Sequence, residues 1–402
     1  MIEVKENKEF KDHKVINGGN MKQGWEIKKL GEVCEVVGGS TPKTNEPSYW
    51  NGEHYWVAPA ELDGTKYISS TQRTITDAGV KSAHLQLLPV GSVLLSSRAP
   101  IGKVAITTVP MYCNQGFKNL VCSDKLYNEF AYWFLYYNTD YLNSLGTGAT
   151  FKEISKRVVE QIPIPVPPLS EQEKIVAELD CLSGVIEKKK QQLKELDALA
   201  ESIFYTMFGD PITNEKGWEV KPLKDVAEII GGSTPKTNIE EYWNGNNYWA
   251  TPAELHGARY LESTERCITN EAVQKTRLTL LPIGTVLLSS RAPIGKVCIT
   301  RVPMYCNQGF KNVVCSDKLH PEYVYQYLFG KTEYLNSLGT GATFKEISKA
   351  TTEKITIPIP PLTLQQEFAD KIEAIEKQKE LIKESITETE TLFNARMQYY
   401  FG

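Results

Sequence analysis

A set of polar and basic residues beside glycines occurs twice in the chain, and the second copy lies 193 residues after the first. Arginine can hold guanine through two acceptors, asparagine and glutamine can do the same for adenine, and lysine neutralises phosphate. Glycine lets a backbone approach a duplex closely. The pattern predicts contacts to duplex DNA, although a turn, a salt bridge or a solvated position is an alternative for any single residue. The predicted contacts are Lys43, Arg98, Lys103, Asn114, Gln115, Lys118, Thr147 and Lys152, with their equivalents Lys236, Arg291, Lys296, Asn307, Gln308, Lys311, Thr340 and Lys345.

Residue patterns typical of catalysis are missing from the sequence. None of the five histidines is shared between the two copies. The run Gly38 to Thr44 lacks the spacing of a phosphate loop and has a proline before its lysine. The Asp/Asn-Pro-Pro-Tyr/Phe motif of amino-methyltransferases does not occur. We therefore expect a protein that is not an enzyme. An enzyme with two duplicated catalytic domains is the alternative, and activity of the purified chain would reveal it.

The eight cysteines do not form a metal-binding pattern, because there is no CxxC and no histidine at zinc-ligand spacing. Cys113 and Cys122 match Cys306 and Cys315 in the repeat, and the other four have no partner there. A metal site at Cys113 and Cys122 is an alternative, but we expect reduced, buried thiols. We predict no metal and no cofactor in this chain.

Bulk composition describes an ordinary globular protein, with 41% hydrophobic and 23% charged residues among 402. The longest apolar stretches are too short to span a bilayer, and the charged N-terminus has no signal core, so we expect a cytoplasmic protein without a membrane partner. Although the net charge is −4, residues 24–165 hold 13 basic and 13 acidic residues, and residues 217–358 hold 16 and 14. Any basic surface must therefore be local.

The duplication extends along nearly the whole chain. Gly24-Trp25-Glu26 returns at Gly217-Trp218-Glu219, and the 193-residue offset then holds without a gap to Gly402. The sequence therefore predicts two tandem units, 24–209 and 217–402. Residues 1–23 form a leader that we expect to be disordered, and residues 210–216 form a short polar joint.

Each unit begins with a part, 24–165 or 217–358, rich in aromatic and β-branched residues, glycine and proline. Turn signals separate short runs that predict strands. An apolar and aromatic stretch near 126–144 predicts a helix. This part is expected to be a mixed α/β (α+β) domain. The predicted strands lie at 55–57, 92–96, 103–107 and 117–122.

The second part of each unit, 166–209 or 359–402, follows a proline-rich connector at 162–168 or its equivalent. Proline cannot lie inside a helix, so the connector is expected to be extended. Ser170, with Glu173 three residues later, predicts a capping box at the start of a helix. Apolar residues then alternate at spacings of four and three, as in a coiled coil, interrupted at Lys189 and Lys379.

These two helices are expected to pair with each other in antiparallel fashion, because each must leave one globular part and deliver the chain to the other. Some 38 residues of helix measure about 57 Å. A helix packed on the core of its own domain is the alternative, which the strongly charged outer face at residues 188–195 disfavours.

The succession of GTGATFKEISK, IPIPVPPLSEQEKI, a long helix and FGDP resembles the specificity subunit of type I restriction–modification systems. The resemblance covers residues 24–402. Its most specific part is Pro167-Pro168-Leu169 with Glu171-Gln172. The second copy keeps Pro360-Pro361-Leu362 and Gln365, but Leu364 replaces Glu171.

The resemblance implies two target recognition domains, 24–165 and 217–358, each reading one half of a split sequence in double-stranded DNA. It implies that the helices at 166–209 and 359–402 set the gap and dock two modification subunits. Those subunits would methylate adenine N6 with S-adenosylmethionine, and restriction/translocase subunits would use ATP and Mg²⁺. All these cofactors would belong to the partners, and the specificity subunit itself would not be catalytic.

The two copies are nearly identical, so they should read nearly the same half-site on opposite strands. The sequence therefore predicts a gapped, palindromic or near-palindromic target. A coiled-coil scaffold that binds proteins without DNA specificity is the alternative. Positions where the half-sites could diverge, with drift as the default explanation, are Glu53/Asn246, His54/Asn247, Lys66/Arg259, Ser82/Lys275, His84/Arg277 and Thr108/Arg301.

Overall fold

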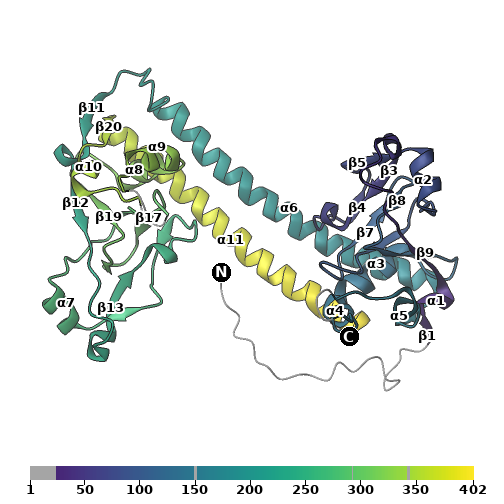
Figure 1. Cartoon of the computed structure of the whole chain (residues 1–402). Coiled ribbons are helices and arrows are strands. Elements are labelled where there is room, and N and C mark those ends of the chain that lie inside the picture. The colour runs from purple at the N-terminus through teal and green to yellow at the C-terminus, as the bar shows by residue number, and fades with distance from the viewer. Residues whose placement is uncertain (1–23, 149–151, 292, 342–344) are drawn as a thin grey trace. The chain divides into compact units, whose positions relative to one another are not determined.

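The computed structural model describes residues 24–148, 152–291, 293–341 and 345–402 (Figure 1). The chain divides into two compact units. The first unit contains residues 24–189 together with 385–402, and the second unit contains residues 190–384. Each unit therefore takes one end of each long helix. The predicted leader, 1–23, lies outside the described residues.

The first unit is built on a five-stranded sheet in the order β2-β9-β6-β7-β4, with a separate three-stranded sheet β5-β3-β8. A third sheet pairs β1 with β10. The strands are β1 (Glu26–Lys29), β2 (Cys34–Gly38), β3 (Trp50–Val57), β4 (Tyr67–Ile68), β5 (Arg73–Ile75), β6 (Val93–Leu95), β7 (Val104–Thr107), β8 (Tyr112–Cys113), β9 (Lys118–Cys122) and β10 (Pro163–Val166). The helices are α1 (Leu30–Val33), η1 (Pro47–Tyr49), η2 (Pro59–Glu61), α2 (Asp77–Ser82), α3 (Asn128–Tyr137), α4 (Thr139–Ser144), α5 (Lys156–Glu160) and α6 (Leu169–Phe208).

The second unit repeats this topology with the sheets β12-β19-β16-β17-β14, β15-β13-β18 and β11-β20. The register repeats as well, because Cys34 opposite Cys122 becomes Ala227 opposite Cys315. The strands are β11 (Glu219–Pro222), β12 (Ala227–Gly231), β13 (Trp243–Ala250), β14 (Tyr260–Leu261), β15 (Cys267–Ile268), β16 (Val286–Leu288), β17 (Val297–Thr300), β18 (Tyr305–Cys306), β19 (Lys311–Cys315) and β20 (Thr356–Ile359). The helices are η3 (Leu223–Asp225), η4 (Glu240–Tyr242), η5 (Pro252–Glu254), α7 (Asn270–Thr276), α8 (Pro321–Leu328), α9 (Thr332–Leu338), α10 (Lys349–Glu353) and α11 (Leu362–Phe401).

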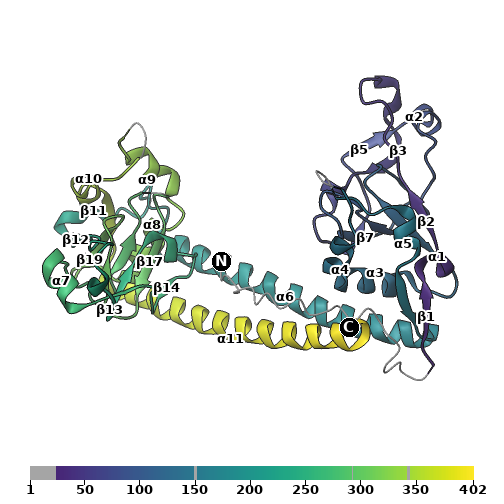
Figure 2. The same cartoon turned by 60° about the horizontal axis from the view of Figure 1, so that its bottom comes forward.

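The long helices α6 and α11 pair in antiparallel fashion inside each unit (Figures 1 and 2). As residue numbers rise along α6, the numbers of the contacting residues on α11 fall. This confirms the predicted antiparallel coiled coil. The contacts are Glu178 with Arg396 and Lys189 with Ser385 in the first unit, and Asp197 with Lys379 and Phe204 with Phe368 in the second unit.

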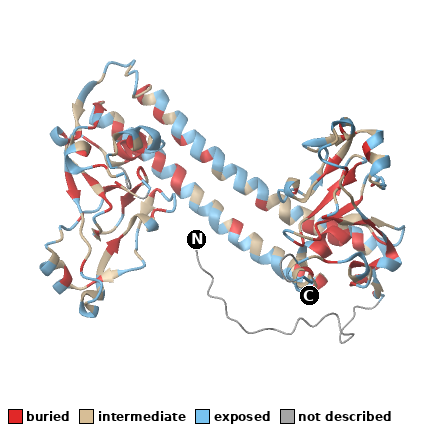
Figure 3. Cartoon of the chain, in the orientation of Figure 1, coloured by how far each residue is buried: buried red, intermediate tan, exposed pale blue. Residues whose placement is uncertain are grey.

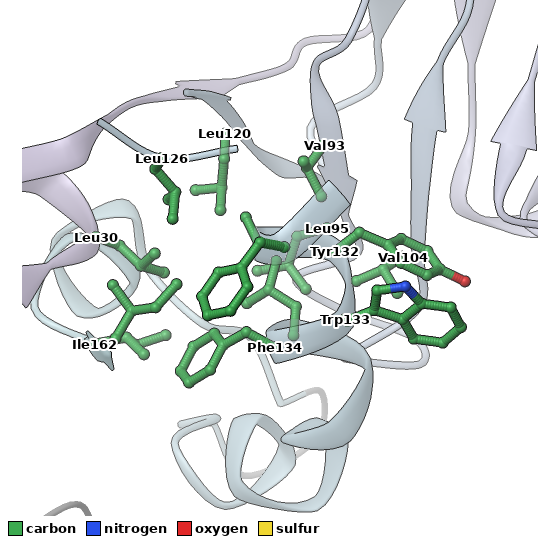
Figure 4. Packing of buried hydrophobic residues seen from close by; sticks show 14 of the residues in the cluster. Leu30, Val93, Leu95, Val104, Leu120, Leu126, Tyr132, Trp133, Phe134 and Ile162 are labelled. Atoms are coloured by element: carbon green, nitrogen blue, oxygen red, sulfur yellow. The ribbon is translucent and has the colours of Figure 1, made fainter. Parts of the chain in front are cut away.

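Each globular core is completed by residues from both long helices. In the first unit, Ile175 and Leu179 of α6 join Met397 and Phe401 of α11 in one buried cluster. In the second unit, the late residues of α6 and the early residues of α11 do the same. The alternative of a helix packed on its own domain is therefore partly right, because the first half of each helix does so. Figure 3 shows buried residues along the sheets and at intervals along the two long helices. Figure 4 shows the core of the first unit, including Leu30, Val93, Leu95, Val104, Leu120, Leu126, Tyr132, Trp133, Phe134 and Ile162.

Two local expectations are wrong. The helix predicted near 126–144 is broken at Asn138, whose side-chain amide donates to the Phe134 carbonyl (2.8 Å) and ends α3. Ser170 is not the cap of α6, because the helix begins at Leu169 and the Gln172 amide donates to the Pro168 carbonyl (3.1 Å). The connector is extended as predicted, and it pairs with β1 as strand β10. Among the described residues, no helix is long and apolar enough to cross a membrane.

Candidate nucleic-acid interface

The residues predicted to contact DNA lie on loops that backbone hydrogen bonds hold together. The Ser40 amide donates to the Cys113 carbonyl (3.0 Å), and the Ser97 amide donates to the Gly116 carbonyl (2.7 Å). The Ile154 amide in turn donates to the Ser97 carbonyl (3.0 Å). These bonds bring residues 39–44, 97–102, 114–118 and 152–154 into one cluster, which we call the loop cluster. The second unit repeats all three bonds.

A glycine makes this close packing possible. A Cβ atom at Gly39 would lie 2.0 Å from the Asn114 carbonyl oxygen, and one at Gly232 would lie 2.1 Å from the Cys306 carbonyl oxygen. No side chain fits at such distances, so the loop that follows the second strand of each unit can approach its neighbour only through glycine.

One carboxylate contacts two of the predicted cations. Glu153 contacts Lys118 Nζ at 3.1 Å and Arg98 Nη1 at 3.9 Å. Only 14% of the Lys118 side chain is exposed. The second unit has the same arrangement, with Glu346 contacting Lys311 and Arg291. These cations therefore help to hold the loop cluster together, and the single carboxylate balances one of their two positive charges.

Other predicted residues also have internal partners. Asn114 Oδ1 accepts from the Gly116 amide (2.7 Å), and Lys103 Nζ donates to the Leu62 carbonyl (2.7 Å). Gln115 is exposed and accepts from the Thr41 hydroxyl, which leaves its amide nitrogen for a ligand. The equivalent bonds in the second unit join Asn307 with Gly309 and Gln308 with Thr234, whereas Lys296 donates to a different carbonyl, that of Pro252 (3.4 Å).

The remaining predicted residues are exposed. The Thr147 backbone pairs with Glu153 and its side chain faces outward, while Lys43 and Lys152 are exposed without an ion pair in the described part of the chain. Their equivalents Thr340, Lys236 and Lys345 are also exposed. The structure thus brings the sixteen predicted residues together in two groups of eight, and it divides each group into internally paired and available side chains.

Sequence reasoning missed an arginine beside this surface. Arg73 lies over the Trp50 ring, with 3.5 Å between its guanidinium carbon and the ring centroid, and Arg266 lies over Trp243 at 3.7 Å. Both arginines are exposed. The 193-residue offset relates them, so repetition alone was a usable signal. They were overlooked because no glycine stands beside them.

Sequence reasoning also missed how each domain grips its helix. Gln172 is fully buried, accepts from the Tyr127 amide (2.8 Å), and donates to the carbonyls of Lys125 (3.0 Å) and Pro167 (2.8 Å). Gln365 makes the same three bonds in the second unit. This glutamine, already notable in the connector motif, fixes the start of each long helix.

A second contact to the helix uses a cation whose side chain is only 15% exposed. Lys66 Nζ lies 2.6 Å from Glu129 and 2.5 Å from Asp180 of α6. Burial lowers the pKa of Lys66, but hydrogen bonds to the two carboxylates outweigh burial and leave the pKa above its ordinary value. Arg259 takes the equivalent place, so the Lys66/Arg259 difference belongs to helix attachment.

The cysteines are only partly as expected. Burial raises the pKa of Cys113 and of Cys306 to about 12, which suits unreactive thiols. Cys181, however, is exposed on α6. All eight are free, and no group of three or more metal-ligating side chains occurs among the described residues.

Comparison with known proteins identifies related chains. The type I restriction modification DNA specificity domain matches residues 22–198 and again 215–391. The chain is 36% identical over 252 residues to the type I restriction enzyme MjaIX specificity subunit of Methanocaldococcus jannaschii, and the alignment covers 58% of each chain. It is 26% identical over 410 residues to the putative MjaX specificity subunit of the same organism, covering 91% of this chain and 92% of that one.

The fold is also shared with a solved structure. A chain from a structure concerned with complex assembly and conformational transition of the type I R-M system superposes with a TM-score of 0.62 at 21% identity, covering 95% of this chain and 98% of that one. Two matches to one domain thus account for most of the sequence. The chain belongs to the type I restriction modification DNA specificity domain family and carries two copies of that domain.

Proposed function

We propose that this chain is the sequence-recognition subunit of a type I restriction–modification complex and that it reads a two-part, gapped site in double-stranded DNA. The observation that carries the proposal is that the same three backbone hydrogen bonds hold the loop cluster together in both units. Each cluster presents an exposed lysine pair and an exposed glutamine. Such groups suit phosphate neutralisation and base-edge hydrogen bonding.

The target is proposed to be near-palindromic. The exposed residues of the two loop clusters are chemically the same, so each unit offers the same hydrogen-bonding groups to DNA. Equivalent domains in inverted orientation read inverted half-sites.

The two long helices are proposed to set the gap between the half-sites and to dock two modification subunits. Those partners would transfer a methyl group from S-adenosylmethionine to adenine N6, and restriction/translocase subunits would use ATP and Mg²⁺. The chain itself would supply recognition and no catalytic group, within a cytoplasmic complex. The two globular parts are close to neutral in total charge, which favours weak DNA binding by the chain alone, with the modification subunits adding affinity.

Sequencing of the methylated bases in DNA modified by the assembled complex tests this function. We expect one gapped motif whose halves are inverted copies. Methylation that does not depend on this chain would contradict the recognition role, and an asymmetric motif would contradict the near-palindrome.

Single substitutions sharpen the test. Gln115→Leu should change the preferred bases in one half of the motif, and Gln308→Leu should change the other half, because each removes an exposed amide from one loop cluster. The matched control is Gln191→Leu, since Gln191 is exposed on α6 and bonds to Glu195 of the same helix (3.2 Å). A change of both halves by one substitution would contradict one unit reading one half.

A further inference from the structure

The small three-stranded sheet of each unit carries an arginine stacked on tryptophan. Trp56 of β3 lies directly opposite Arg73 of β5, so both side chains share one face of the sheet. The Arg73 guanidinium carbon is 3.5 Å from the centroid of Trp50 and 5.5 Å from that of Trp56. In the second unit, Arg266 lies 3.7 Å from Trp243 and 5.4 Å from Trp249. The repeat has therefore kept a complete three-residue arrangement.

The same tryptophans hold the loop that carries an exposed lysine. Trp50 Nε1 donates to the Lys43 carbonyl (3.1 Å), and Trp56 Nε1 donates to the Ser40 carbonyl (3.1 Å). Trp243 and Trp249 make the equivalent bonds to Lys236 (3.3 Å) and Ser233 (3.1 Å). One tryptophan thus contacts both Arg73 and the backbone of Lys43, and this fixes the two cationic residues on the same indole.

Among the described residues, the positive charge of this arginine has no acidic partner. Most cations shared by the two repeats contact a carboxylate or a carbonyl, as Arg98, Lys103 and Lys118 do. Within the described residues, Arg73 and Arg266 have no ion pair, and both are exposed. A guanidinium lying flat on an indole is held by cation–π attraction while its N–H edge stays available.

We infer that Arg73 and Arg266 each bind a backbone phosphate of DNA, aided by Lys43 and Lys236 beside them. The inference rests on the proposed DNA recognition and names residues for it. The fork of a guanidinium matches two phosphate oxygens, and the indole orients the fork before binding.

Salt dependence of DNA binding tests the inference. The full chain and the variant R73A/R266A are each assembled with the modification subunits. Their binding is measured to a duplex that carries the recognised motif and to an unrelated duplex. In B-DNA each phosphate contact contributes about 0.9 to the slope of log K against log salt concentration, so losing two should lower the slope by roughly 1.8. The sequence motif that the variant complex methylates should be the same as that of the wild-type complex. R73K/R266K keeps the charge and should keep most of the slope, with weaker binding.

The matched control is K125A/K318A, which also removes two exposed cations shared by the repeats, without an ion pair in the described chain. It should leave the slope unchanged. An R73A/R266A complex that melts earlier but keeps the wild-type slope would show that the arginines only pack on tryptophan, and would overturn the inference. A changed motif would overturn it in favour of base reading. If the wild-type complex shows no sequence preference, the proposed function fails, whereas a slope change of the expected size would still support the phosphate contact.

Discussion

The two units attach to their long helices with the same glutamine but with different ion pairs. In the first unit, Lys66 reaches Glu129 and Asp180, and Trp133 Nε1 also donates to Asp180 (2.9 Å). In the second unit, Arg259 reaches Glu322 (3.0 Å), Gln326 (2.8 Å) and Glu376 (3.3 Å). Gln326 stands at the position equivalent to Trp133. Glu373 is the equivalent of Asp180, but the helix carboxylate that contacts Arg259 is Glu376, nearly a turn further along α11.

This difference shows that divergence between the repeats need not concern DNA. A longer cation needs room and more acceptors, and the second unit supplies both by exchanging an indole for an amide. Lys379 adds a further positive charge by contacting Glu376 (2.9 Å) and Asp197 (2.7 Å). The attachment is retained while its side chains change together, as expected for one coupled network.

The largest expected effect comes from removing these cations. Arg259 is 7% exposed and Lys66 15%, so Arg259→Ala leaves Glu322 without its cation in a drier environment, while Glu376 keeps Lys379. We expect Arg259→Ala to destabilise the second unit by about 3 to 5 kcal/mol. Lys66→Ala should cost the first unit roughly 1 to 3 kcal/mol. Hydrogen exchange of core peptides in each unit measures the two losses separately, and equal losses would contradict the role given to burial.

A smaller and equal effect is expected at the shared glutamine. Gln172→Ala and Gln365→Ala each leave one amide and two carbonyls without their partner, at a cost of about 2 to 3 kcal/mol. Because the bonds are the same in both units, the two losses of stability should agree. Hydrogen exchange of core peptides from each unit at increasing denaturant concentration measures them. A clear difference would show that the glutamines are not equivalent.

The smallest effect concerns a contact found in only one repeat. Trp25 Nε1 donates to Glu171 (3.0 Å), whereas Trp218 Nε1 donates to the Phe208 carbonyl (2.9 Å), since Leu364 replaces the glutamate. Glu171→Leu should cost the first unit about 1 kcal/mol. Glu173→Leu is the control, because Glu173 is exposed two residues further along α6 and has no hydrogen bond or ion pair within the described residues. Tryptophan fluorescence during thermal unfolding measures both, and an unaffected first unit would contradict the assigned bond.

Much of the fold could be predicted because repetition and periodicity are local in sequence. The coiled coil followed from apolar spacing, and Lys189 and Lys379, which interrupt it, bond to Ser385 and Asp197 of the opposing helix. The break at Asn138 and the true start of α6 depend on local bonds, from the Asn138 side chain to the Phe134 carbonyl and from the Gln172 amide to the Pro168 carbonyl, and neither apolar spacing nor a capping motif reveals which local bond forms. Ser170 matches a capping motif, but the proline before Leu169 had already placed its carbonyl in the capping position.

The candidate site was harder to predict than the fold. Sequence could identify cations kept in both repeats, but not which of them contact a carboxylate. Glu153 lies 35 residues from Lys118 along the chain, so the ion pair between them could not be inferred from the sequence. Arg73 looked like a surface arginine until the structure placed two indoles beneath it.

The sharing of helix ends between the cores has a consequence for how the chain is made. The core of the first unit contains Met397 and Phe401, which a ribosome adds only after both globular domains have been synthesised. The second unit needs Phe204 and Phe208 in the same way, and these are already present when its strands emerge. The domain translated first must therefore wait longest for its last core residues, with the aromatic side chains Phe130 and Phe134 uncovered until Phe401 arrives.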